Sequence, residues 1–267
     1  MNGLSWVAGF RKTLGVPRVL DMHSSAQHDR NSRVSGLIRE LNSLASPEIA
    51  RHSQRFFKTG KGEYGEGDKF LGIRVPTLRK VAKKYSHLNL QEATQLLKSP
   101  FHEVRLLSLF ILVAHYERAS EHEKGEIVNL YLDNAKSINN WDLVDSSAHK
   151  ILGDYLLNRD KLLLYRLASS TDIWERRIAI IATAKFISMG FFDDTIRLSE
   201  CLLSDKEDLI HKAVGWMLRE VGKRNLEAEL DFLNSHAREM PRTMLRYAIE
   251  KFPKSLKQDY MAGISSK

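Results

Sequence analysis

Residues 177–184 read RIAIIATA, a stretch in which apolar residues follow a single cation through two helical turns. Similar amphipathic stretches recur along the chain: RLLSLFIL from Arg105, WDLVDSSAHKIL from Trp141, KAVGWMLR from Lys212 and RYAIEKF from Arg246. Their first residues are 36, 36, 35 and 34 positions apart. A period in this range is typical of paired helices stacked one on the next. The sequence therefore predicts an all-α fold, an α-solenoid of helical repeats.

Helix-start signals support the same class. Ser46 and Pro47 have the residue types of an N-cap and a first helical position, and Ser120 and Glu123 have capping-box spacing. Alternating strand patterns are missing from the sequence, and no Asn-Gly pair joins two such stretches into a hairpin. The irregular segment KTGKGEYGEGDKFLGIRVP, residues 58–76, lacks the ending of a phosphate-binding P-loop, so we interpret it as a flexible connection.

The domain organisation follows from where the helical pattern begins and ends. The pattern starts near Val34, so we predict one repeat domain over residues 34–260 with a short C-terminal tail, 261–267. Residues 1–33 are predicted to be a disordered extension, within which Met22 is an alternative start of translation.

Composition favours a polyanionic partner. Lys and Arg number 41 against 33 Asp and Glu, a net charge of +8, although a basic surface can also simply be solvated. The single cysteine, Cys201, permits no intramolecular disulfide and no cysteine–histidine metal site, which fits a reducing cytoplasm. The longest apolar run is too short to cross a bilayer.

The repeat places its first residues in one register, so we expect their side chains to line one surface, a concave basic groove wide enough for a duplex. Trp141 and Asp145 stand four apart and share a helix face, and Lys212 and Trp216 repeat that spacing. Each residue also has an ordinary interpretation. A tryptophan on a helix is commonly core packing, and single charges are commonly solvated or cap a helix.

Three strings together resemble the signatures of the AlkD-type DNA alkylation repair family, which are HEAT-like-repeat DNA glycosylases: WDLVDS, IWERRIAI and KAVGWMLRE. The segment FFKTGKGEYGEGDKFLGIRVPTLRKVAKKY also resembles the N-terminal part of that family. The resemblance extends over about residues 35 to 255, with the motifs in the same order.

The resemblance implies excision of positively charged N3- and N7-alkylated purines, such as N3-methyladenine and N7-methylguanine, from duplex DNA in base excision repair. It implies no metal or organic cofactor and no base flipping. Trp141 and Trp216 would flank the lesion, Asp145 would be the catalytic acid, and Arg177 would contact the DNA backbone. A third lesion-contacting aromatic would be Phe56, Phe57 or Tyr64. The remaining predicted DNA-binding cations are Arg105, Arg176, Lys212 and Arg246.

The chemistry of the residues agrees with these roles. An alkylated purine already carries positive charge, so a carboxylate near the sugar and indole faces around the base are the groups its removal needs. Two other classes fit the pattern: a non-catalytic nucleic-acid-binding repeat protein, and a protein–protein scaffold. We expect a monomer in the cytoplasm, associated with the nucleoid if the source is a bacterium, with no membrane partner.

Overall fold

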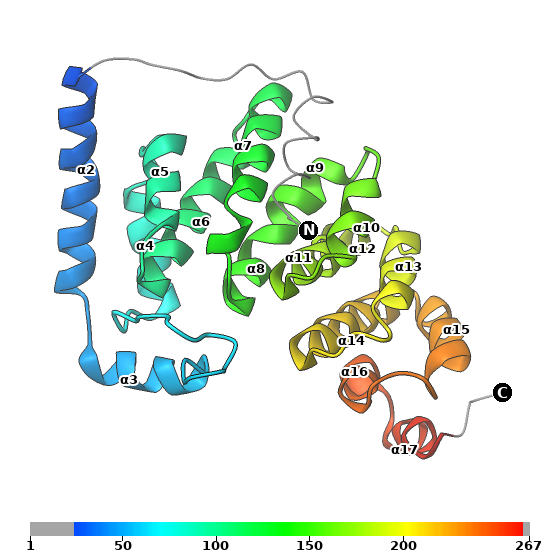
Figure 1. Cartoon of the computed structure of the whole chain (residues 1–267). Helices are drawn as coiled ribbons and strands as arrows, with labels where there is room; N and C mark the ends of the chain where they lie inside the picture. Colours follow the sequence, from blue (N-terminus) through cyan, green and yellow to red (C-terminus); the bar gives the residue numbers. More distant parts are fainter. Residues whose placement is uncertain (1–23, 264–267) are drawn as a thin grey trace. The chain divides into compact units, whose positions relative to one another are not determined.

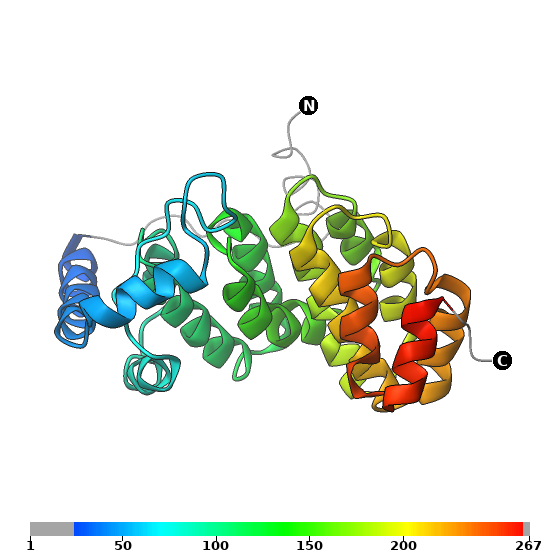
Figure 2. The same cartoon turned by 90° about the horizontal axis from the view of Figure 1, so that it is seen from below.

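The computed structural model describes residues 24–263, and over that range it contains helices and connecting segments but no β-strand (Figures 1 and 2). One isolated β-bridge within the range joins Lys69 to Phe101. The all-α class predicted from the repeat is confirmed.

The chain divides into two compact units, with the boundary between Ser147 and Ala148. This boundary falls at the end of α8, inside the single repeat domain predicted over residues 34–260. The first unit contains α2 (Ser24–Ser43), α3 (Pro47–Phe56), α4 (Val75–Lys84), α5 (Leu90–Leu97), α6 (His102–Tyr116), α7 (Glu121–Asp133), the 3-10 turn η1 (Ala135–Ser137) and α8 (Trp141–Ala148).

The second unit opens with a π-helical turn, η2 (His149–Gly153), which follows α8 directly. The helices after it are α9 (Asp154–Leu156), α10 (Leu162–Ala168), α11 (Ile173–Ala182), α12 (Ala184–Ser188), α13 (Asp193–Cys201), α14 (Asp208–Gly222), α15 (Leu226–His236), α16 (Arg242–Ala248), the 3-10 turn η3 (Ile249–Lys251) and α17 (Lys254–Ala262).

Within each unit, neighbouring helices pack as pairs. In the first unit α6 contacts α4, α5 and α7, and in the second α14 contacts α11, α13, α15 and α16. The helices at these centres, α6 and α14, each contain one of the amphipathic stretches of the sequence repeat. The predicted organisation into helical repeats is therefore confirmed.

Helix α2 begins at Ser24, ten residues before Val34, where the apolar pattern of the sequence starts. The division into an extension over residues 1–33 and a repeat domain over 34–260 stays a prediction. Residues 24–33 carry little apolar periodicity, but they contain no proline or glycine to interrupt a helix. Residues 1–23, which include the alternative start Met22, and residues 264–267 lie outside the described range. At the C-terminal end α17 runs to Ala262, the second residue of the predicted tail, 261–267.

Two capping predictions are confirmed. Ser46 caps α3, accepting a hydrogen bond from the Ile49 amide at 3.4 Å, and Pro47 follows as the first helical residue. Ser120 and Glu123 form a reciprocal capping box at the start of α7. These caps are local, so the sequence alone was sufficient to find them.

The glycine-rich segment between α3 and α4 is anchored, and its interpretation as a flexible connection is wrong. The buried carboxylate of Glu103 on α6 accepts hydrogen bonds from the amides of Leu71, Gly72 and Ile73 at 2.9, 2.7 and 3.2 Å. The side chains of Phe70, Leu71 and Ile73 are also buried. The carboxylate of a residue distant in the sequence thus accepts the amide hydrogen bonds that backbone carbonyls would accept in a helix or a β-sheet.

Among the described helices none is both long and apolar enough to cross a bilayer.

The contact between α14 and α16, shown side by side in Figures 1 and 2, depends on a glycine. A Cβ built on Gly215 would lie 2.6 Å from the Cβ of Tyr247 and would overlap the Met244 carbonyl oxygen. Gly36 on α2, by contrast, has no heavy atom within 4 Å of such a Cβ. A side chain at position 215 would therefore clash with α16, whereas one at position 36 would meet open space.

We expect Gly215→Ala to destabilise the protein by about 1 to 3 kcal/mol, because the added methyl separates α14 from α16. Gly36→Ala is the matched control and should stabilise by up to about 1 kcal/mol, through the better helix propensity of alanine. Urea unfolding of both variants measures the difference. A stabilising Gly215→Ala would show that the two helices do not pack as closely as described.

Candidate functional site

Aromatic rings from α3 and α8 meet at the start of α8. The Phe57 ring stacks on the Trp141 indole with centroids 5.2 Å apart and planes at 21°, and the Phe56 ring meets the indole edge-on at 5.9 Å. Phe56 is 58% exposed, whereas Phe57 and Trp141 are half-buried. We call these three residues the aromatic cluster. Of the three candidate N-terminal aromatics, Phe56 and Phe57 contact Trp141, and Tyr64 lies half-buried in the glycine-rich segment.

The chain turns sharply after α3 and folds back on the helix end. Lys58 adopts φ 51°, in the left-handed region that non-glycine residues rarely occupy. The Gly65 amide then donates to the Lys58 carbonyl at 3.1 Å, and a Cβ on Gly65 would lie 2.5 Å from the Phe57 carbonyl oxygen. The glycine allows the returning segment to close over the backbone that carries the two phenylalanines.

Four charged side chains lie beneath the aromatic cluster. His102 contacts the Asp68 carboxylate through Nδ1 at 3.1 Å and the Asp142 carboxylate through Nε2 at 2.8 Å. Arg105 donates to the other Asp68 oxygen at 2.6 Å. The side chains of Asp68, His102 and Arg105 are buried, and that of Asp142 is 16% exposed. We call these four residues the charge network.

The two carboxylates keep His102 protonated. Burial by itself lowers the pKa of the imidazolium, but the hydrogen bonds and charges of Asp142 and Asp68 outweigh it and raise the pKa from 6.5 to about 9. For Asp68, burial acts to raise the pKa, and the His102 hydrogen bond and the Arg105 charge hold it below its ordinary value. Both ring nitrogens of His102 are thus donors at neutral pH.

Asp145 lies one helical turn after Trp141 on α8, as the spacing predicted, and its side chain is half-buried. The charge of Asp145 acts on the buried side chain of Tyr131. Burial raises the pKa of the Tyr131 hydroxyl, and the Asp145 carboxylate raises it further. The Tyr131 hydroxyl hydrogen-bonds Ser147 at 3.0 Å. Helix α8 therefore presents an indole and a carboxylate four residues apart, with the carboxylate close to the core of the unit.

Two predicted groove cations are buried, so the expectation that all five register positions line one exposed surface is wrong for Arg105 and Arg177. Arg105 is 5% exposed and bonds Asp68, Asn139 and the Ser99 carbonyl. Arg177 is 4% exposed and donates to the Leu209 carbonyl. The physical reason is that α6 and α11 are enclosed by other elements of their units, so guanidiniums in their first two turns are buried.

The repeat register is shifted by one residue relative to the predicted one. Arg105 donates to the Ser99 carbonyl, Arg176 to the Ser170 carbonyl and His211 to the Asp205 carbonyl, in each case the residue six positions earlier. Arg105 therefore corresponds to Arg176 and His211, not to Arg177 and Lys212. Arg176 also pairs with Asp205 at 2.6 Å, as Arg105 pairs with Asp68. These side chains tie the loop before a helix to the helix itself.

The other predicted residues of the second unit are more accessible. The Lys212 side chain is 37% exposed and pairs with Asp208 at 2.7 Å, one helical turn away. Trp216 is half-buried, and its Nε1 donates to Glu220 at 3.2 Å. Arg246 on α16 is exposed.

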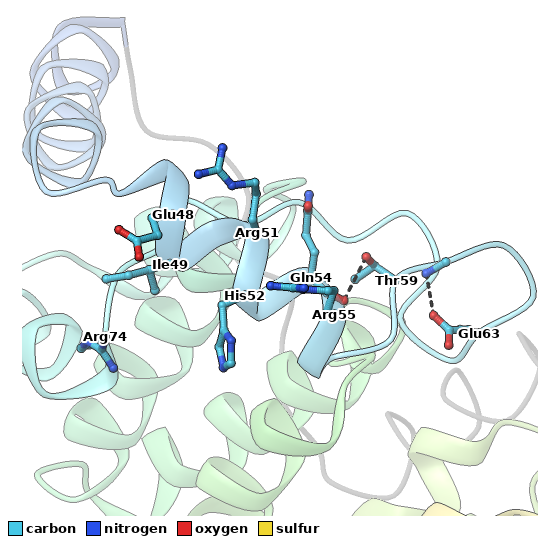
Figure 3. Close-up of a pocket in the computed structure, with 10 residues that line it drawn as sticks. Glu48, Ile49, Arg51, His52, Gln54, Arg55, Thr59, Glu63 and Arg74 are labelled. Atoms are coloured by element: carbon cyan, nitrogen blue, oxygen red, sulfur yellow. Dashed lines mark hydrogen bonds between the residues drawn. The ribbon is translucent and has the colours of Figure 1, made fainter.

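A basic groove on α3 was not predicted. It has a volume of about 940 Å³, and its lining includes Arg51, His52, Arg55 and Arg74, all exposed, together with two glutamates (Figure 3). One of these, Glu63, accepts a hydrogen bond from the Gly60 amide at 2.8 Å. The His52 ring stacks with Phe56 at 6.5 Å and 12°. The groove therefore adjoins the exposed edge of the aromatic cluster.

The comparisons with known proteins show which family the chain belongs to. A family model described as DNA alkylation repair enzyme matches residues 37–252. The chain belongs to this family. Among solved structures, a predicted DNA alkylation repair enzyme from Enterococcus faecalis is similar at 20% identity with a TM-score of 0.61, covering 79% of this chain and 98% of its own. That likeness shows a shared fold. No curated protein matches the sequence.

Membership of the DNA alkylation repair enzyme family confirms the resemblance seen in the motifs and indicates a role in DNA alkylation repair.

Sequence reasoning missed the charge network and the α3 groove. The string RHSQRFF did carry a signal for the groove, because it combines arginines four apart with aromatic residues on one short helix. The charge network joins residues that are 34 and 40 positions apart, so no local pattern could reveal it.

The raised pKa of His102 predicts a specific dependence of stability on pH. Because the folded pKa exceeds the unfolded one, the stabilisation is complete below about pH 6.5 and is lost as pH rises through about 9. Urea unfolding of the wild type from about pH 6 to 10 measures this loss. His102→Gln serves as the reference, since it lacks the titrating ring. The same decline in both proteins would contradict a protonated His102.

Proposed function

We propose that this protein is a DNA glycosylase that removes positively charged N3- and N7-alkylated purines, such as N3-methyladenine and N7-methylguanine, from duplex DNA in base excision repair. The observation that carries the proposal is the aromatic cluster beside Asp145 on α8. Family membership supports the broader role in alkylation repair.

The aromatic cluster suits a cationic base. The face of an indole bears the negative end of its quadrupole, so a positively charged purine is favoured against it over a neutral one. Phe57 supports the Trp141 ring from one side, and the exposed Phe56 edge extends the apolar surface. We assign Phe56 as the third aromatic that contacts the lesion, because it is the more exposed of the two phenylalanines. Trp216 is proposed as the second indole.

Asp145 would act on the sugar. The bond from C1′ to the purine nitrogen breaks with its electron pair going to the base, which becomes neutral, and positive charge develops on the sugar. A carboxylate held nearby stabilises that charge and orients the water that adds to C1′, accepting a proton from it. The products are a free alkylpurine and an abasic site. This reaction needs no general acid, because the alkylated base is already a good leaving group.

The DNA backbone would be held by exposed cations. Arg51 and Arg55 in the α3 groove, and Lys212 and Arg246 in the second unit, are accessible enough to contact phosphates. Arg105 and Arg176 are instead engaged within their own units, so we assign them a structural role. The guanidinium of Arg177, which was predicted to contact the DNA backbone, is buried. We therefore propose the exposed cations as the main phosphate contacts and Arg177 as a weaker one.

We further propose that the lesion stays stacked in the duplex during excision. Enzymes that flip their target hold it in an enclosed pocket. In this protein Phe56 is largely exposed and Trp141 is only half-buried, so the proposed contact surface lies at the edge of the first unit. A duplex could meet such a surface without extruding a base.

Asp145→Asn should lower the single-turnover release of N7-methylguanine from duplex DNA by a factor on the order of 100 or more, because the carboxylate charge is lost from the transition state. Affinity for DNA should stay the same or increase slightly, since a negative charge is removed. Chromatography of the released base and fluorescence anisotropy of the duplex measure the two effects.

Glu117→Gln, at an exposed position after α6, is the control for a lost carboxylate and should excise normally. Wild-type excision by Asp145→Asn would refute the assignment of this residue. Tight, salt-dependent binding without release of any alkylated base by the wild type would favour a non-catalytic DNA-binding protein. Absence of DNA binding would favour a protein–protein scaffold.

The α3 groove makes a separate prediction about salt. If Arg51 and Arg55 each contact a phosphate, the double variant Arg51→Ala/Arg55→Ala should reduce the slope of log affinity against log salt by about two units. Lys98→Ala removes an exposed cation after α5 and should leave the slope unchanged. Titration of a lesion-free duplex over a range of salt concentrations measures both slopes. Equal slopes in the double variant and the wild type would place DNA elsewhere.

A further inference from the structure

The backbone on both sides of Trp141 is held by the charge network. Asn140 donates to Asp68 at 3.3 Å, and Asp142 accepts from His102 at 2.8 Å. Arg105, which also holds Asp68, donates to Asn139 at 3.0 Å. Three of the four residues from Asn139 to Asp142 are thus fixed by side chains from the glycine-rich segment and α6, and the fourth is the indole itself.

The indole is held through the same histidine. The His102 ring contacts the rings of Phe57 and Phe70, each with centroids 4.8 Å away. Phe57 in turn stacks on Trp141. His102 therefore supports the backbone of Trp141 through Asp142 and its side chain through Phe57. Both routes lie within the first unit.

Among the described residues, the Asp142 carboxylate has one hydrogen-bond partner, His102. Its Oδ2 meets His102, while its Oδ1 is buried and makes no hydrogen bond in the structure. Asp142 lies in the first turn of α8, where a negative charge also interacts favourably with the helix dipole. Removing the His102 contact would leave a largely buried charge uncompensated at the start of the helix.

We propose that His102 is a positioning residue for the aromatic site. Through Asp142 and Phe57 it fixes the first turn of α8, and with it the placement of Trp141 and of Asp145 one turn later. The inference rests on the proposed function for its effect on excision, since small misplacements of reacting groups can cost one to two orders of magnitude in rate. In this role His102 does not touch the substrate.

The test removes the hydrogen bond between Asp142 and His102 and compares the result with the loss of a buried ion pair at another helix. Asp142→Ala removes the anchor, and Asp142→Asn restores a group that accepts from His102. Glu92→Ala is the matched control, because Glu92 is also buried, is paired with Arg33 at 3.1 Å and caps a different helix, α5. Each variant is assayed for thermal stability, for single-turnover excision of N7-methylguanine, and for hydrogen exchange of the peptide that covers α8.

We expect Asp142→Ala to excise about 10- to 100-fold more slowly and to exchange faster over α8. Asp142→Asn should recover a large part of both. Glu92→Ala should lose comparable stability but keep the excision rate and the α8 exchange of the wild type. If Asp142→Ala does not fold, His102→Gln must show the same slower excision and faster α8 exchange.

Two results would overturn the inference: unchanged α8 exchange in folded Asp142→Ala and His102→Gln, or an equal loss of excision in Glu92→Ala at matched stability. Hydrogen exchange requires no activity, so it keeps the two proposals separate. If the wild type releases no base, the proposed function fails, and α8 exchange alone then supports or overturns the positioning role.

Discussion

The first unit depends on a buried imidazolium between two carboxylates. His102 joins the glycine-rich segment, through Asp68, to α8, through Asp142, and the helix that carries it is the centre of the unit. With Arg105 included, two negative and two positive groups balance, which is the condition under which so many charges can be buried. Without that balance, the segment that follows the two phenylalanines would lose its link through Asp68, His102 and Asp142 to the start of α8.

Local features were predictable from the sequence. Helix caps such as Ser120 with Glu123, the period of the repeat and the shared face of Trp141 and Asp145 all depend on residues within one or two turns of each other. The stacking of Phe57 on Trp141 depends on a chain reversal after α3 and on contacts many residues away. No periodicity encodes such contacts, so the sequence left Phe56, Phe57 and Tyr64 as alternatives.

The shifted register shows a different limit of sequence reasoning. A guanidinium that binds phosphate and one that ties a loop to a helix are the same chemical group, and their position in a repeat does not distinguish them. Arg105 and Arg176 were expected on a surface, yet each bonds a carbonyl six residues earlier and a carboxylate from another segment. Asp68 and Asp205 balance the charges of these two arginines. A prediction that paired each arginine with an acid would have placed both arginines in the interior.

Phe56 has a thermodynamic consequence for any partner that covers it. In the unbound protein 58% of this side chain faces water beside the half-buried Trp141. Covering apolar surface removes its ordered hydration, and the heat capacity of the system falls. Association at the aromatic cluster would thus carry a negative heat-capacity change, whereas phosphate contacts in the α3 groove would chiefly release counterions. Temperature and salt are therefore independent controls on two adjoining parts of one surface.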